Sequence, residues 1–529
     1  MLSLSRLVLL CFLSLTAAAV PSSSGDRAET LRGRRRVDLD GVAQLDKRAT
    51  RREPGGGSVE LISCGGANHD NYCVGGPDEY DQYQYGRAVY YDGSNEYYDS
   101  TYDHDAYNDD FRAAHDHSDN HHDDPHDDFP TARNQCDNNY NDYFEASGYY
   151  HSCTSTLPKP TTFVKRAAGS QQLTLNGANY RIAGPNIYWL CQDENVSPFG
   201  YYTDKGRVRE ALAIAVAMGA NTVRLHTCGV SIGANNPYNL EPSNNVWPDV
   251  AWDIHDYVIY AAGQYGLRVI MPLSDNYDFY HGGKYDILRF TGVSQANKGA
   301  QFFTNQYALN AFTVYVKKLL SHTNVYTGKR WADDPTILAW ETGNEWGGYM
   351  NAEAWPPAAW TTAVINAIKS IDKNHLVIDG TNGLWNYTTG ATPAGLQVPT
   401  VDIVTDHGYP RKTDILSKEI QIARTAKKGF FIGEFDWTST GGGVSLSSYL
   451  SAIEGAGNYL GSMAWSVFGH DAQCCNFVQH NDGYSLYYPN GNSNADQQNI
   501  LLLVQHWYRI TGRKVPTSLP GVACPQPYF

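Results

Sequence analysis

Short apolar runs and amphipathic segments alternate along the chain from about residue 168 onward. Continuous apolar runs are typical of strands buried on both faces, whereas apolar residues at every third or fourth position are typical of helices. The predicted strands lie within residues 174–189, 221–226, 267–272, 336–340, 376–379, 401–405, 429–432 and 461–465. The predicted helices cover residues 208–218, 253–264, 305–320, 360–371, 415–425 and 446–454.

This alternation, with about eight strands, predicts an α/β protein with a (β/α)8 barrel and loop insertions. A doubly wound open sheet is the competing fold class. It would place a glycine-rich phosphate-binding loop after the first strand, and Gly184-Pro-Asn is not such a loop. The 529 residues suffice for a large barrel plus accessory segments.

The first 52 residues carry processing signals. Arg6, the apolar run 7–15 and the small residues before Pro21 predict a signal peptide over residues 1–20, and therefore a secreted protein. That run is too short to span a bilayer, and no later stretch is long enough. Residues 21–52 are polar and basic with dibasic pairs at the end, which predicts a propeptide; Lys165-Arg166 is a further dibasic pair.

Residues 53–167 differ from the rest in composition. Tyr, Asp, Asn and His dominate residues 75–152 and aliphatic residues are scarce, which predicts disorder, with weak binding of a divalent metal as the less favoured alternative. Four cysteines bracket this stretch: Cys64, Cys73, Cys136 and Cys153. Together with a Ser/Thr/Pro-rich linker they resemble a fungal-type cellulose-binding module, although the low-complexity stretch stands where such modules have only a few residues. A disulfide-looped leader is the alternative. The (β/α)8 domain is predicted over residues 168–529.

Charge and cysteine content narrow the function classes. The net charge of -15 and the absence of a basic patch exclude a nucleic-acid partner. Aromatic residues make up 13% of the chain, which suits either stacking on sugars or filling a large core. Secretion permits disulfides. Cys191 with Cys228 is one plausible pair, and either Cys474 or Cys475 could pair with Cys524. Asn195 and Asn386 begin glycosylation sequons.

Two glutamates follow apolar strands in the same way. The strand starting at Ile337 ends in a glycine-flanked loop with Asn344 and Glu345, and the strand starting at Phe430 ends at Glu434. In a barrel of this kind, function lies at the carboxyl ends of the strands. Two such carboxylates are what glycoside hydrolysis requires. Further strand ends carry Trp189, Arg224, Asp275, Asn276, His407, Tyr409 and Trp465, most of which suit sugar chemistry.

The chemistry of these strand-end residues predicts a role for most of them. Glu345 is the acid/base and Glu434 the nucleophile, at the separation of about 5–5.5 Å of a retaining enzyme. Glu341 would be the acid only in a different strand register. At the other positions we expect contacts with the substrate or with the glutamates: Asn344 bonds the sugar 2-hydroxyl, Arg224 and Tyr409 donate to Glu434, His407 bonds Glu345 or the sugar, Trp465 forms a platform, and Trp189 and Asn276 contact substrate.

These motifs resemble glycoside hydrolase family 5, over roughly residues 168–516. The family pattern matches Asn344-Glu345, Glu434 in Ile-Gly-Glu-Phe, Arg224 in Val-Arg-Leu, His407-Gly-Tyr409 and Trp465. The resemblance implies a retaining (β/α)8 hydrolase without metal or organic cofactor. The family's further histidine has no clear counterpart.

Within the family, the segment ending at Glu345 is most similar to fungal β-1,4-mannanases, and Asp275-Asn276-Tyr277 is similar to their Asn-Asn-Trp segment. Two departures are Trp346, where mannanases commonly carry Pro, and the elaborated loop at His281-Gly-Gly-Lys. We therefore expect a monomeric, secreted mannanase that acts on a β-linked polysaccharide. A β-glucanase or cellulase of the same family, and a non-catalytic wall-binding protein, are the alternatives.

Overall fold

The computed structural model describes residues 62–63, 72–73, 157–167, 169–233, 236–348, 355–386, 389–457 and 459–529. The chain divides into two units, Met1–Glu79 and Tyr80–Phe529. In the first, β1 (Ile62–Ser63) and β2 (Tyr72–Cys73) form an antiparallel pair. The predicted signal peptide, the propeptide and most of the low-complexity region, with the cysteines at 64, 136 and 153, lie outside the described residues.

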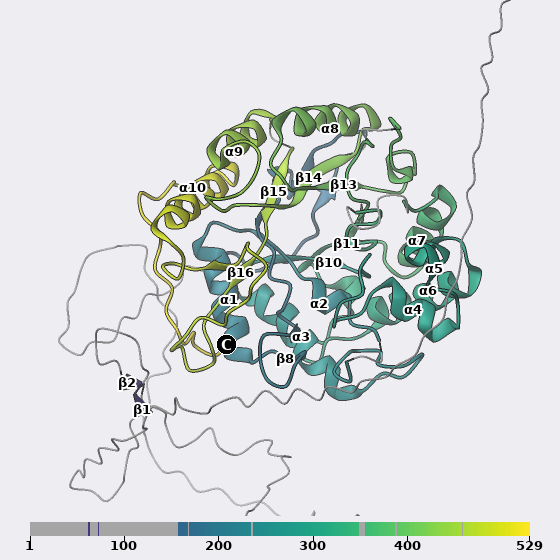
Figure 1. Ribbon diagram of the computed structural model, residues 1–529, viewed down its shortest axis with the longest axis horizontal. Coiled ribbons are helices and arrows are strands. Elements are labelled where there is room, and N and C mark those ends of the chain that lie inside the picture. Colours follow the sequence, from purple (N-terminus) through teal and green to yellow (C-terminus); the bar gives the residue numbers. More distant parts are fainter. Residues whose placement is uncertain are drawn as a thin grey trace, which may run out of the picture. The chain divides into compact units, whose positions relative to one another are not determined.

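Eight parallel strands form the centre of the second unit (Figure 1). They are β6 (Ala183–Pro185), β9 (Thr222–Arg224), β10 (Arg268–Pro272), β11 (Ile337–Glu341), β12 (Leu376–Asp379), β13 (Ile403–Gly408), β14 (Gly429–Phe435) and β15 (Gly461–Ala464). They pair in the order β6-β15-β14-β13-β12-β11-β10-β9. A parallel bridge between Asn186 and Arg224 joins the first and last strands of this order and closes the ring. The predicted (β/α)8 barrel is confirmed.

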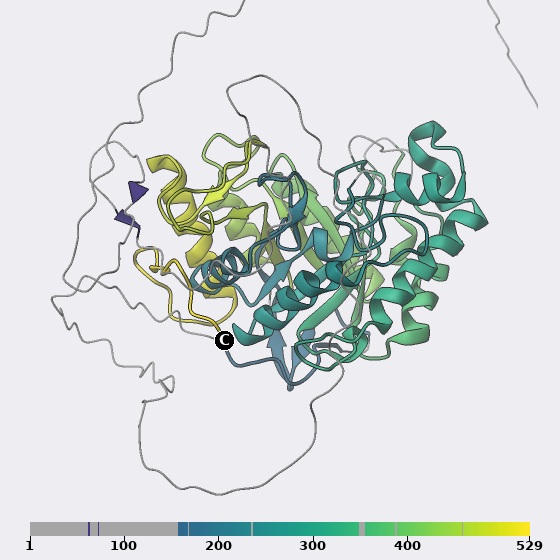
Figure 2. The same ribbon diagram turned by 90° about the horizontal axis from the view of Figure 1, so that it is seen from below.

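Helices surround these strands, and Figure 2 shows this outer layer from a second side. The longer ones are α1 (Lys205–Ala217), α3 (Asp249–Gln264), α6 (Gln306–Ser321), α7 (Ala358–Ile371), α8 (Thr413–Ala426), α9 (Leu446–Gly455) and α10 (Asn494–Ile510). In α6 the buried residues Ala308, Phe312 and Tyr315 lie one turn apart, so one face of the helix covers the barrel. The structure adds α10 and two short helices after strands, α2 (His226–Gly229) and α4 (Lys284–Thr291), to the predicted set.

A small antiparallel sheet contributes to a second core inside the barrel. It consists of β3 (Lys165–Arg166), β4 (Leu173–Leu175) and β5 (Ala178–Tyr180). Val164, Leu173 and Tyr180 pack in one buried cluster with barrel residues such as Ile270 and Phe431. The leading hairpin is therefore present, and β3 adds residues that precede position 168 to the same sheet.

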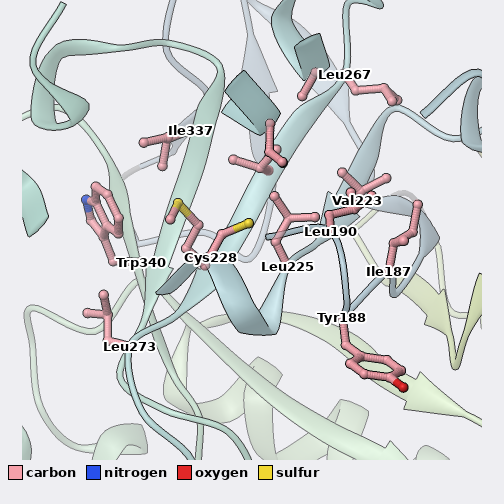
Figure 3. Packing of buried hydrophobic residues seen from close by; sticks show 14 of the residues in the cluster. Ile187, Tyr188, Leu190, Val223, Leu225, Cys228, Leu267, Leu273, Ile337 and Trp340 are labelled. Atoms are coloured by element: carbon pink, nitrogen blue, oxygen red, sulfur yellow. The ribbon is translucent and has the colours of Figure 1, made fainter. Parts of the chain in front are cut away.

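The main core lies between the strands and the helices. Figure 3 shows part of it, with side chains from β9, from β11 and from residues flanking β10 packed together. Cys228 lies in this core and forms a disulfide with Cys191; a second disulfide joins Cys474 to Cys524. The first predicted pair is confirmed, and of the two partners left open for Cys524 the structure selects Cys474. Within the described ranges, no helix is both long and apolar enough to cross a bilayer.

Candidate active site

Glu345 stands in a loop that continues along the rim of the barrel after β11. Asn344 forms a parallel bridge with Asp275, and Trp346 forms one with Thr381. Glu345 itself has a φ of 53°, in the left-handed region that is uncommon for residues other than glycine. Gly343 is required here because a Cβ at this position would lie 2.0 Å from the Trp346 ring. A left-handed conformation at a residue other than glycine, as at Glu345, is strained, and such strain is typical of functional positions.

Arg224 connects the groups of the site through one fully buried guanidinium. Its Nε and Nη2 donate to the two oxygens of Glu341 at 2.7 and 2.9 Å. Nη1 donates to Glu434 at 2.8 Å, and Nη2 also donates to Asn344 at 2.9 Å. Glu341 is fully buried in this bidentate pair. It therefore anchors Arg224 and does not face the cleft as an acid would.

Glu434 ends its strand among hydrogen-bond donors. Besides Arg224, the Tyr409 hydroxyl donates to its second oxygen at 3.3 Å. The His226 Nε2 atom lies 3.9 Å from the first oxygen. A guanidinium and a hydroxyl that both point at one carboxylate favour its ionised form and fix its direction. This is the environment that a nucleophilic carboxylate needs.

Glu345 faces a different pair of donors. The Tyr277 hydroxyl donates to Oε2 at 2.7 Å, and His407 Nδ1 lies 2.6 Å from Oε1. The same His407 nitrogen lies 3.5 Å from Glu434. The nearest oxygens of Glu345 and Glu434 and the His407 nitrogen all lie within 4.8 Å of one another. The two strand-end glutamates thus converge on one point above the barrel.

The three groups titrate as one cluster. Although burial lowers the pKa of His407, the charges of Glu434 and Glu345 raise it overall. Burial raises the pKa of Glu434 to about 7. Burial also raises the pKa of Glu345, but the His407 cation and the Tyr277 hydroxyl outweigh this and lower it.

A nucleophile requires the lower pKa and an acid the higher one, whereas here Glu434 has the higher pKa. The expected roles of the two glutamates therefore rest on their positions. Once His407 is neutral, Glu434 still has the Arg224 cation at 2.8 Å. Glu345 then has the uncharged Tyr277 hydroxyl. This arrangement favours the proton on Glu345 and the charge on Glu434.

Trp465 supplies an aromatic surface beside the glutamates. Its indole N–H donates to Asp482 at 2.7 Å, and its ring stacks on Tyr188 with centroids 5.2 Å apart. The His226 ring meets it edge-on at 5.3 Å. The ring is partly exposed and held on two sides, as a sugar platform should be.

Two predicted substrate contacts lie elsewhere. Trp189 is fully buried and its indole donates to the carbonyl of Val467, so the structure does not bring it to the glutamates. Asn276 is also buried, and its side-chain oxygen accepts from Lys284 at 2.7 Å. Both side chains are therefore engaged in contacts within the protein. The structure brings the other predicted residues together around Arg224 and the two glutamates.

Sequence reasoning missed Tyr188, Tyr277 and His226. Tyr188 precedes the predicted contact Trp189, and Tyr277 follows the predicted contact Asn276, so each lies one position from a predicted residue. His226 is two residues after Arg224, the spacing that puts two side chains on one face of an extended segment. Burial and the Arg224 charge hold its pKa well below the usual range. Neutral His226 accepts from Arg224 at Nε2, which places its proton on Nδ1.

A metal could use the spacing of Glu345, His407 and Glu434, because each offers a ligand atom within 4.8 Å of the others. The two carboxylates already accept hydrogen bonds from Arg224, Tyr277 and Tyr409. The guanidinium 2.8 Å from Glu434 would also repel a cation. The donor set suits proton transfer better than metal binding.

Residues 161–428, more than half of the chain, match the family model described as GH family 5 beta-mannosidase-like. The chain belongs to this family. Among curated relatives it is similar to Mannan endo-1,4-beta-mannosidase 1 of Oryza sativa, with 30% identity over 46% of this chain and 58% of the relative. Mannan endo-1,4-beta-mannosidase 1 of Arabidopsis thaliana is 28% identical over 51% and 66%. The chain thus spans about three fifths of the length of these relatives.

Solved structures share the fold. The endo-β-1,4-mannanase from Thermotoga petrophila superposes with a TM-score of 0.53 and 21% identity, covering 64% of this chain and 79% of that chain. A glycoside hydrolase family 5 mannosidase from Rhizomucor miehei also gives a TM-score of 0.53, with 17% identity over 66% and 99%. The predicted family is confirmed by the family model and the predicted fold by these structures.

Proposed function

We propose that this protein is a retaining glycoside hydrolase that cleaves β-1,4-mannosidic bonds in mannan-type polysaccharides. The observation that carries the proposal is the convergence of Glu345 and Glu434, whose nearest oxygens lie within 4.8 Å. That spacing suits direct attack by one carboxylate better than the wider gap of about 6.5–9.5 Å that admits a water in inverting enzymes. The two mannan endo-1,4-beta-mannosidase relatives support the choice of polymer.

In the first step, ionised Glu434 attacks the anomeric carbon while Glu345 gives its proton to the leaving oxygen. Arg224 and Tyr409 hold the attacking carboxylate in place. Asn344 is fixed by Arg224 at its oxygen and by Asp275 at its amide. Asn344 and Glu434 thus share Arg224 as a donor, and we assign the second amide hydrogen of Asn344 to a hydrogen bond with the sugar 2-hydroxyl.

In the second step, Glu345 acts as a base. It takes a proton from water, and the resulting hydroxide displaces Glu434 from the sugar with overall retention. His407 Nδ1 lies 2.6 Å from the Glu345 carboxylate. This proton can therefore move between the two side chains. Tyr277 keeps the Glu345 carboxylate oriented through both steps. We also infer secretion, since residues 1–20 have the pattern of a signal peptide.

A substrate panel tests this function. Pure mannan, glucomannan and carboxymethylcellulose are incubated with the purified protein, and reducing ends and product sizes are measured. We expect release from mannan and glucomannan, with proton NMR showing the β-anomer first. Release from carboxymethylcellulose alone would favour a glucanase. Binding without any release would favour a wall-binding protein.

Two variants assign the roles. Glu345→Gln should lower kcat by about 10²–10⁴-fold, the usual contribution of general acid/base catalysis. Glu434→Ala should abolish turnover, because no covalent intermediate can form. Asp414→Asn on the exposed side of α8 is the matched control and should leave activity unchanged. Near-normal hydrolysis by Glu434→Ala would contradict the mechanism.

A further inference from the structure

The segment His281-Gly-Gly-Lys284, one of the two departures from the mannanase pattern, folds back onto the loop that follows β10. The backbone N–H of Lys284 donates to the carbonyl of Asp275 at 2.9 Å. A Cβ at Gly282, where φ is 102°, would lie 1.9 Å from the carbonyl oxygen of Ile232. Glycine is therefore required at this close approach, and the turn it permits brings the His281 side chain to Asp275.

Asp275 is 1% exposed and has donors on both of its oxygens. Oδ1 accepts from the Asn344 side-chain amide at 3.2 Å and from the backbone N–H of Tyr277 at 3.1 Å. Oδ2 lies 3.2 Å from His281 Nε2. Within the described residues, His281 supplies the one side-chain hydrogen bond to Oδ2. Since a carboxylate only accepts, the imidazole is the donor and carries a proton on Nε2.

His281 is held in place from several sides. It is 4% exposed, its ring stacks on Phe279 with centroids 5.8 Å apart, and the Tyr280 ring meets it edge-on at 4.9 Å. Its carbonyl accepts from the backbone N–H of Ile232 at 3.2 Å. Its Nδ1 atom has no hydrogen-bond partner within the described residues. A buried polar atom without a partner is costly, so the presence of histidine here requires a reason other than stability.

The hydrogen bonds of Asp275 connect His281 to the active site. Asp275 accepts from the amide nitrogen of Asn344, and Arg224 donates to the amide oxygen. The two ends of an amide differ in that one donates and the other accepts. An acceptor at one end and a cation at the other therefore determine which way the Asn344 amide faces. In the proposed mechanism its second hydrogen bonds the sugar 2-hydroxyl, so this step rests on the proposed function.

We propose that His281 is a positioning residue for the reaction, which acts through Asp275 to hold the Asn344 amide toward the sugar 2-hydroxyl. Without the imidazole N–H, the buried Asp275 loses the donor at Oδ2, and its ionised form is disfavoured. A protonated Asp275 has a donor of its own and no longer fixes the amide of Asn344. The contact with the 2-hydroxyl strengthens in the transition state, so its loss lowers kcat more than it raises KM.

Two substitutions separate the N–H of His281 from its ring. His281→Phe keeps a ring of similar size and has no donor. His281→Gln has no ring but keeps an amide N–H that can reach the Oδ2 atom of Asp275. Asp278→Asn is the matched control, because this carboxylate lies in the same loop but is exposed and paired with Arg289.

Kinetics on two substrates test the proposal: a nitrophenyl β-mannobioside and its analogue without the 2-hydroxyl on the reacting sugar. On the first, His281→Phe should lower kcat by about 5- to 30-fold, the value of one hydrogen bond, and change KM less than twofold. On the second, kcat should change less than twofold, because the contact is already absent. His281→Gln should recover most of the loss, and Asp278→Asn should match the wild type on both substrates.

Three kinetic results would overturn the proposal. The first is an unchanged kcat for His281→Phe on the mannobioside. The second is an equal fall on both substrates, which indicates a structural role. The third is a His281→Gln variant as slow as His281→Phe, which shows that the N–H has no part in the effect.

A measurement without turnover separates this proposal from the proposed function. The side-chain amide signals of Asn344 in ¹⁵N NMR spectra, assigned with Asn344→Asp, should shift in His281→Phe and stay in place in Asp278→Asn. If the wild type hydrolyses no mannoside, the proposed function fails and the spectra decide alone. Shifted Asn344 signals in His281→Phe then support the link through Asp275, and unchanged signals reject it.

Discussion

Arg224 is the residue on which the site depends. A fully buried cation is costly unless nearby carboxylates and hydrogen bonds compensate it. Glu341 accepts from Nε and from one N–H of Nη2, which leaves Nη1 available to Glu434 and the second Nη2 N–H available to Asn344. Burial lowers the pKa of Arg224, but Glu341 and Glu434 outweigh this and raise it, so it stays charged. Glu341 thus acts on the chemistry through Arg224.

Glu341→Gln tests this dependence. The amide keeps the shape of the side chain but leaves part of the buried Arg224 charge uncompensated. Breaking a buried pair typically costs about 3–5 kcal/mol, so we expect that loss in the free energy of unfolding, measured by urea denaturation. Asp333→Asn, in the exposed pair with Arg330, is the control and should leave the free energy of unfolding close to the wild-type value. Equal losses in both variants would contradict the role given to Glu341.

In the proposed mechanism, His407 sets the pH dependence of the reaction. Its positive charge lowers the pKa of both glutamates, against the effect of burial. His407→Asn removes that charge, so both pKa values should rise. The acid limb of the kcat/KM profile reports ionisation of Glu434 and the alkaline limb reports loss of the Glu345 proton. We expect both limbs to move to higher pH in profiles on a nitrophenyl β-mannobioside.

Tyr409→Phe is the comparison for this profile. It removes a hydroxyl that donates to Glu434. In the described contacts, this hydroxyl forms no hydrogen bond with Glu345. The acid limb alone should then move to higher pH. A shift of both limbs in Tyr409→Phe, or of neither limb in His407→Asn, would reject the assignment of limbs to residues.

The strands and helices were largely predictable, and the loop contacts were not. Apolar runs located all eight barrel strands because strands buried on both faces need apolar residues at every position. The rim geometry depends on packing between distant loops. The sequence predicted a substrate contact at Trp189, whereas the neighbouring Tyr188 is the residue that stacks on Trp465. The role of Glu341 depends on Arg224, which lies 117 residues earlier in the chain. Helix α10 was missed because its first turns are rich in Asn and Gln.

The Cys191–Cys228 disulfide joins the segment after β6 to α2 after β9, just below the site. Cys191→Ser with Cys228→Ser opens a loop with a sequence separation of 37 residues. Bridges of this span typically contribute about 2–4 kcal/mol, so the free energy of unfolding should fall by that amount. Cys475→Ser, outside both disulfides, is the control and should leave stability unchanged. A double variant as stable as the wild type would show that packing alone holds these two segments.

The packing of the folded barrel determines whether a protease can reach the dibasic pair at its start. The dibasic pair Lys165-Arg166 is strand β3, which pairs with β4 and belongs to the sheet that contributes to the inner core. Arg166 donates to the carbonyl of Lys427 at 3.0 Å and lies 3.4 Å from the Asp402 carboxylate. A protease needs an extended segment without such bonds. The folded barrel should therefore protect this pair, although its sequence matches a processing site.

We accordingly predict that proteolytic processing of the chain occurs after Arg48 or Arg52 and not after Arg166. N-terminal sequencing and intact mass of the protein recovered from a secreting host measure this directly. A chain that begins at residue 167 would lack β3 and Val164, which is buried in the inner core, so it should unfold at a lower temperature than a chain that begins at residue 157. Lys165→Ala with Arg166→Ala removes the processing motif but keeps the strand, and should leave the secreted mass unchanged apart from the substitutions. A mature chain starting at residue 167 with full stability would show that β3 is dispensable to the barrel.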